Sequence, residues 1–168
     1  DVTISAMTVP IKQASRFGTI MVDAKNRVNG FEEKPKSPKP IPGNPNAVYA
    51  SMGNYVFSYD ALVKILHEES GEDAALDFGK TILPSIHKRY RVFAYDFGTQ
   101  KLPGLKPYEE KSYWRDVGTL EAFWAAQMDL LGARPRMDLN NKLWPIQDSK
   151  HNTAPTKIIE SALADCLL

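Results

Sequence analysis

Several short segments of the 168-residue sequence combine residue types that bind phosphates, sugar hydroxyls or hard cations. The most informative is Ser112–Thr119, in which Asp116 stands between two aromatic residues and a glycine, and in which Thr119 can cap a helix. A carboxylate held at a strand end above a helix start suits a site for phosphates and Mg²⁺. This cation takes one or two carboxylates together with substrate phosphates and water. The alternative interpretation is a structural aspartate that hydrogen-bonds only to backbone.

A second segment, Phe31–Pro35, places opposite charges at the end of an expected strand. Lys34 offers a mobile point charge suited to a phosphate, and Glu33 can accept hydrogen bonds from sugar hydroxyls. A solvated charge cluster at a loop mouth is the alternative.

Two further segments have similar double interpretations. Ser51–Tyr55 opens a strand with a small hydroxyl and Gly53, which lets a ligand approach the backbone closely. A strand that simply begins with small side chains, without any ligand, explains this segment equally well. Asp77 precedes a helical pattern and is expected to cap it. The Asp77–Lys80 segment is not a kinase magnesium motif, because the other kinase elements are absent.

The elements that must position these residues alternate between strands and helices, which predicts an α/β fold with a mixed sheet. We expect strands over 2–9, 18–22, 27–33, 51–58 and 91–97, the second and third forming a hairpin about the turn 23–26. We expect helices over 60–67 and 78–87, the latter kinked or delayed by Pro84, and a third after Thr119 with an apolar stripe of Leu120, Phe123, Trp124, Met128 and Leu131. The five prolines between Pro35 and Pro45 predict an extended loop, and 68–73 an acidic solvated loop.

Composition restricts the class of protein. A net charge of +1 gives no reason for nonspecific nucleic-acid binding, and the apolar runs are too short to span a membrane. Cys166 is the single cysteine, which excludes an internal disulfide and a cysteine-based zinc site and fits a reducing compartment. The chain begins in strand-like sequence without methionine and stops in apolar sequence, so we expect a fragment of a longer polypeptide.

The motifs occur in an order that closely resembles the bacterial ADP-glucose pyrophosphorylases, also called glucose-1-phosphate adenylyltransferases. The resemblance covers nearly the whole chain, and the wider nucleotidyl-sugar pyrophosphorylase family shares the Glu-Lys-Pro and Asp-x-Gly-Thr elements. The Ser-Met-Gly and Trp-Arg-Asp-Val-Gly-Thr forms indicate the ADP-glucose branch. The matching segments are Phe17–Gly18, Phe31–Pro35, Ala50–Phe57, Asp77–Lys80, Tyr113–Thr119 and Trp144–Ile146.

This resemblance implies a Rossmann-like catalytic domain followed by a left-handed β-helix domain. Residues 1–135 would form the sugar-phosphate half of the catalytic domain, 136–153 a linker and 154–168 the start of the β-helix. The family joins ATP and glucose 1-phosphate, with Mg²⁺, into ADP-glucose and pyrophosphate in bacterial glycogen synthesis. Its members are usually homotetramers under allosteric control, and we expect a cytoplasmic protein.

The resemblance also assigns roles residue by residue. Lys34 would hold the phosphate of glucose 1-phosphate, and Asp116 would be a magnesium ligand. Glu33 and Ser51 would bind the sugar, with Gly18 close to it. The remaining residues would line or support the sugar pocket: Tyr55, Asp77, Phe78 and Trp114.

One departure from the family pattern is large. The chain contains no Gly-Gly-x-Gly stretch, and the resemblance places the nucleotide loop and a second magnesium-binding aspartate upstream of everything here. We therefore expect the activity to belong to the full-length parent and this chain alone to be inactive. Two alternatives stay open: a non-catalytic sugar-phosphate-binding or assembly module, and a pyrophosphorylase for another sugar nucleotide.

Overall fold

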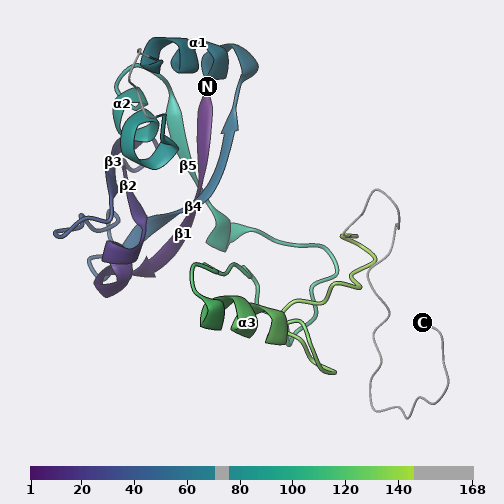
Figure 1. The fold of residues 1–168 in the computed structure, drawn as a ribbon. Helices are drawn as coiled ribbons and strands as arrows, with labels where there is room; N and C mark the ends of the chain where they lie inside the picture. Colours follow the sequence, from purple (N-terminus) through teal and green to yellow (C-terminus); the bar gives the residue numbers. More distant parts are fainter. Residues whose placement is uncertain (71–75, 146–168) are drawn as a thin grey trace. The chain divides into compact units, whose positions relative to one another are not determined.

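The computed structural model describes residues 1–70 and 76–145, and the chain divides into two compact units, Asp1–Gly98 and Thr99–Leu168 (Figure 1). The elements of the first unit are β1 (Val2–Pro10), the 3₁₀ helix η1 (Ile11–Arg16), β2 (Gly18–Val22), β3 (Val28–Glu33), β4 (Ala47–Phe57), α1 (Tyr59–Glu69), the π-helical turn η2 (Phe78–Ile82), α2 (Leu83–Ile86) and β5 (Val92–Asp96). The short 3₁₀ turn η3 (Phe97–Thr99) spans the boundary, and the second unit contains α3 (Leu120–Met128).

The strands of the first unit form one five-stranded sheet in the order β3-β2-β4-β1-β5. β5 runs parallel to β1 and the other neighbours are antiparallel, which confirms the predicted mixed sheet. The predicted hairpin is also present, because β2 and β3 pair directly. Along β5 the side chains alternate as the sequence predicted: Val92 and Ala94 are buried, whereas Phe93 and Tyr95 are exposed.

β4 is longer than the sequence predicted, and it is irregular. It begins at Ala47, because residues before Ser51 continue the ladder with β1 as far as Pro10. The pairing then shifts: Ser51 faces Ala6 and Tyr55 faces Ile4, so three residues of β4 stand opposite one of β1. This bulge is centred on Gly53, whose φ of 77° is a left-handed conformation that glycine adopts without strain.

The core of the first unit lies between the sheet and its helices. Ile65 of α1, Ile82 of η2 and Ile86 of α2 are fully buried together with Ile4 and Val92 of the strands. Truncating one such isoleucine to alanine typically costs about 2–5 kcal/mol. Pro84 stands in the first turn of α2, where its missing N–H is harmless, so the predicted helix over 78–87 starts late as a regular α-helix.

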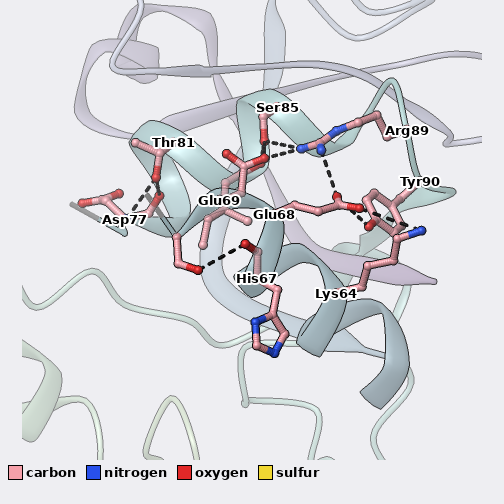
Figure 2. Close-up of polar contacts among 11 residues, drawn as sticks. Lys64, His67, Glu68, Glu69, Asp77, Thr81, Ser85, Arg89 and Tyr90 are labelled. Carbon is pink, nitrogen blue, oxygen red and sulfur yellow. Dashed lines mark hydrogen bonds and ion pairs between the residues drawn. The ribbon is translucent and has the colours of Figure 1, made fainter. Parts of the chain in front are cut away.

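A polar cluster joins the end of α1 to the segment that follows α2 (Figure 2). Glu68 and Glu69 both pair with Arg89, Glu68 also accepts a hydrogen bond from Tyr90, and Ser85 donates to Glu69. The expected acidic loop is therefore wrong at its start. Both glutamates belong to the last turn of α1, and each forms an ion pair with Arg89, which follows α2.

The second unit differs most from expectation. Thr119 caps α3 as predicted, by accepting a hydrogen bond from the Ala122 N–H at 3.1 Å. The apolar stripe of α3 is largely exposed, from 40% at Met128 to 84% at Leu120. Ser112–Gly118 forms no strand, so the strand-end position predicted for Asp116 is wrong. No described strand pairs with this segment, and side-chain bonds hold it instead.

Two sets of predictions fall beyond the described residues. Residues 146–153 of the expected linker and all of 154–168 are not described, so the domain boundaries stay predictions. Among the residues that are described, no helix combines the length and apolarity needed to cross a membrane.

Candidate functional site

The β2–β3 hairpin positions the first part of the site. Gly18 and Glu33 face each other in register, and a Cβ on Gly18 would stand 2.8 Å from Glu33 Oε2 and 2.6 Å from the Phe31 ring. Such distances are below any ordinary contact, so the carboxylate approaches this backbone only because residue 18 is a glycine. Gly18 and Glu33, both predicted site residues, are thus brought together.

Lys34 follows at the end of β3. Its φ of 49° lies in the left-handed region, which is uncommon for a residue with a side chain. Its N–H donates to the Phe17 carbonyl at 3.0 Å, so the hairpin holds this backbone in place. Lys34 is exposed, as a cation that meets a phosphate from solvent requires.

The turn η2 presents a second carboxylate. Asp77 Oδ1 accepts the Lys80 N–H at 2.8 Å, which confirms the predicted cap. Thr81 locks the same residue twice: its hydroxyl donates to the Asp77 carbonyl at 2.7 Å and accepts the Asp77 N–H at 3.0 Å (Figure 2). The point where a Cβ on Gly79 would stand lies 3.2 Å from Glu33 Oε2 and 3.5 Å from Asp77 Oδ1. Both carboxylates therefore border one small space above Gly79.

Aromatic side chains extend the site toward β4. The Phe78 ring stacks on Tyr55 with centroids 5.6 Å apart and meets Phe57 at 5.8 Å. Tyr55 in turn places its hydroxyl 3.4 Å from Ser51 Oγ. In a regular strand residues four apart are separated by about 13 Å, so the bulge is what brings Ser51 and Tyr55 together. Ser51 Oγ also accepts the Gly53 N–H at 3.3 Å, which ties the bulge to the same hydroxyl.

Trp114 and Asp116 belong to the second unit, where the neighbouring Arg115 organises their segment. The Arg115 guanidinium binds both Glu110 oxygens, at 2.9 and 2.7 Å, and Asp129 at 2.8 Å. It also donates to the Trp114 carbonyl at 2.9 Å and lies over the Tyr113 ring. This guanidinium lowers the pKa of Glu110 below its ordinary value near 4.5. The segment that carries Trp114 and Asp116 is thus fixed by charge-assisted bonds in place of a strand ladder.

A complete metal centre is not formed by the residues described. Within 1–70 and 76–145 no three histidine, cysteine, aspartate or glutamate side chains group in a way that would hold a metal ion. Asp116 is exposed, and its Oδ1 lies 3.3 Å from the point where a Cβ on Gly118 would stand. Because Mg²⁺ uses few protein carboxylates and many phosphate and water oxygens, Asp116 fits one ligand position of such a site.

The predicted residues therefore fall into two groups. Contacts connect six of them within the first unit, with Lys34 next to Glu33: Gly18, Glu33, Ser51, Tyr55, Asp77 and Phe78. Sequence reasoning missed Gly79 and Thr81, although both stand in or beside the Asp77–Lys80 motif that it singled out. It also missed Arg115, inside the most informative motif; the available signal was an arginine five residues after Glu110.

Comparison with known proteins shows the family to which the chain belongs. The model of the nucleotidyl transferase family matches residues 1–132. A glucose-1-phosphate adenylyltransferase of Thermodesulfovibrio yellowstonii is 42% identical over 168 residues, which cover 99% of this chain and 41% of that protein. Those of Vibrio cholerae and Thermus thermophilus are 48% and 44% identical, with 87% and 95% of this chain and 36% and 38% of each relative covered.

The chain thus spans about two fifths of the length of the curated relatives it matches. These similarities confirm the resemblance that the order of motifs indicated. With a mixed α/β sheet and a family model that matches most of its length, the chain belongs to the nucleotidyl transferase family.

Proposed function

We propose that this chain is the sugar-phosphate-binding part of a glucose-1-phosphate adenylyltransferase, which makes ADP-glucose and pyrophosphate from ATP and glucose 1-phosphate. One observation carries the proposal: Glu33 and Asp77, from different elements, border the same space above Gly79, and Lys34 stands beside them. Carboxylates that accept from hydroxyls, next to a cation for a phosphate, match a sugar phosphate. The names of the relatives support ADP-glucose over another sugar nucleotide.

Each residue of the site has a distinct task in this proposal. Glu33 and Asp77 accept hydrogen bonds from sugar hydroxyls, and the Lys34 ammonium pairs with the phosphate. Ser51 donates or accepts at the sugar, and the aromatic pair of Tyr55 and Phe78 supports its apolar face. For Trp114, which belongs to the second unit, a role in lining or supporting the sugar pocket stays a prediction from the resemblance.

The reaction needs positioning more than proton transfer. A phosphate oxygen of glucose 1-phosphate attacks the α-phosphorus of ATP, the bond from that phosphorus to the β-phosphate oxygen breaks, and pyrophosphate leaves. A phosphate is already a competent nucleophile at neutral pH, so the protein orients the reactants and neutralises charge. Mg²⁺ bound at Asp116 and the substrate phosphates would supply part of that neutralisation.

The wider organisation follows the same family. In this proposal residues 1–135 form the sugar-phosphate half of the catalytic domain, 136–153 a linker and 154–168 the start of a β-helix. The nucleotide loop and a second magnesium-binding aspartate belong to the remainder of the parent protein. That protein would be a cytoplasmic, allosterically controlled homotetramer that functions in glycogen synthesis.

Titration of the chain with glucose 1-phosphate tests the proposal, with Lys34→Ala as the variant and Lys36→Ala, an exposed lysine of the same loop, as the matched control. We expect saturable binding by the unmodified chain and by Lys36→Ala, and at least about tenfold weaker binding by Lys34→Ala, because one charge-assisted phosphate contact is lost. Equal binding by both variants would refute the role of Lys34. No binding by any of the three would favour the assembly module instead.

A turnover assay separates binding from catalysis. With ATP, glucose 1-phosphate and Mg²⁺ present, the 168-residue chain should release no pyrophosphate, because it contains no glycine-rich nucleotide loop. Pyrophosphate release by this chain alone would contradict the proposed division of labour.

A further inference from the structure

Gly79 lies inside η2, where its backbone does not require glycine. It is absent from the glycines with positive φ in the described residues. Glycine is a poorer helix former than alanine wherever both can adopt the backbone conformation. A different reason is therefore needed for a glycine at this point of the turn.

The space above the residue supplies that reason. A Cβ at position 79 would stand 3.2 Å from Glu33 Oε2 and 3.7 Å from the carboxyl carbon of the same side chain. The first distance is tighter than ordinary van der Waals contact, so the carboxylate would have to move by a few tenths of an ångström. Glu33 is exposed, and its flexible end can turn into solvent without disturbing the core.

We propose that Gly79 is a positioning residue that sets the affinity for the sugar by keeping the Glu33 carboxylate in place between β2 and η2. The inference rests on the proposed function, because it assumes that Glu33 accepts hydrogen bonds from the sugar of a hexose phosphate. A carboxylate can serve two neighbouring hydroxyls only from one position, so a small displacement weakens both bonds. In this proposal a methyl group at position 79 weakens ligand binding by displacing the Glu33 carboxylate.

Gly18, which lies close to the same carboxylate, provides a contrast. A Cβ there would meet the Phe31 ring at 2.6 Å, and this ring is buried, with only 6% exposed. An aromatic ring in the core cannot move aside as a solvent-exposed carboxylate can. Alanine at position 18 should therefore damage folding, whereas alanine at position 79 should not.

The test compares stability and binding in the 168-residue chain and its Gly79→Ala variant. We expect an unchanged or higher thermal midpoint, followed by far-ultraviolet circular dichroism, together with about tenfold weaker binding of glucose 1-phosphate in titration calorimetry. Binding of inorganic phosphate should stay the same, because Lys34 is untouched. Lys80→Ala is the matched control: it changes the next residue of the turn but leaves its backbone bond to Asp77, and should alter neither ligand's affinity.

A double-variant comparison shows whether the effect passes through Glu33. In a Glu33→Ala background, adding Gly79→Ala should leave the affinity for glucose 1-phosphate unchanged, because the displaced group is already gone. The inference is overturned if Gly79→Ala binds like the unmodified chain, if phosphate and sugar phosphate weaken equally, or if the loss persists in the Glu33→Ala background. Failure of the unmodified chain to bind glucose 1-phosphate would refute the proposed function itself, and this inference with it.

Discussion

Replacing Arg115 by alanine should destabilise the second unit more than any change to its neighbouring arginine. The Arg115 side chain is 27% exposed and serves Glu110 and Asp129, which are 36% and 18% exposed. Arg136 contacts the same two acids at 3.5 and 3.2 Å, but its own side chain is 64% exposed. Arg115 is therefore the inner cation of the network and Arg136 the outer one.

The expected magnitudes follow from this arrangement. An exposed ion pair contributes up to about 1 kcal/mol to stability, and a partly buried bidentate arginine–carboxylate pair contributes more. We expect Arg115→Ala to lower the free energy of unfolding of the second unit by about 2 kcal/mol, because Arg136 still neutralises part of the acidic charge. Arg115→Lys keeps a charge but loses the planar fork and should cost about 1 kcal/mol, whereas Arg136→Ala should cost about 0.5 kcal/mol.

Tryptophan fluorescence gives an assay that is specific to this unit. The three tryptophans of the chain are Trp114, Trp124 and Trp144, and all of them lie beyond Gly98. A loss of about 2 kcal/mol corresponds to a fall of about 10 °C in the thermal midpoint for a unit of this size. Circular dichroism, which also reports the sheet of the first unit, should show a much smaller shift.

The order of the variants is the decisive outcome. Arg134→Ala, at an exposed arginine of the same unit, provides the baseline for removing a surface charge. If Arg136→Ala proves as damaging as Arg115→Ala, or if Arg115→Ala matches Arg134→Ala, then the inner position of Arg115 does not govern the stability of the segment that carries Trp114 and Asp116.

Three further predictions concern charge, assembly and the bulge. Because Arg115 lowers the pKa of Glu110, this pair stabilises the folded state above about pH 4.5 and less as the pH falls below it; the difference in denaturation midpoint between the unmodified chain and Glu110→Gln should narrow in acid. The exposed apolar face of α3 should make the chain self-associate, and Trp124→Lys should lower the average mass measured by light scattering. A monomer of the unmodified chain at high concentration would contradict the predicted self-association. Gly53→Ala should lower the free energy of unfolding by about 1–2 kcal/mol and weaken sugar-phosphate binding, because φ at Gly53 is 77°. Gly53→Asn, which tolerates this conformation better, should lose less stability in scanning calorimetry and less affinity in titration calorimetry.

Several parts of the fold were predictable because they depend on neighbours in the sequence. The caps at Asp77 and Thr119 each bind an N–H three residues ahead, so a short polar residue before a helical pattern is sufficient to predict them. The alternation along β5 needs only one buried and one exposed face. The order of the motifs likewise predicts that Glu33, Ser51 and Asp77 belong to one site, and that role stays a prediction.

Other parts failed because nothing local encodes them. Ser51 was predicted to begin a strand, but β4 starts at Ala47 because β1 extends far enough to pair with it. Asp116 was placed at a strand end, yet its segment has no pairing strand among the described residues and depends on Arg115 reaching Asp129. Periodicity reports which face of an element is apolar and does not report which partner is present.

The sequence by itself determined the chemistry available to this protein: a lysine, several carboxylates and a hydroxyl, in an order typical of one family. Tertiary structure alone decided their geometry. The bulge at Gly53 brings the Ser51 and Tyr55 hydroxyls to 3.4 Å, and the packing of η2 on the β2–β3 hairpin brings Glu33 to Gly79. Both contacts join residues through space, so their distances depend on strand register and core packing, which no short stretch of sequence specifies.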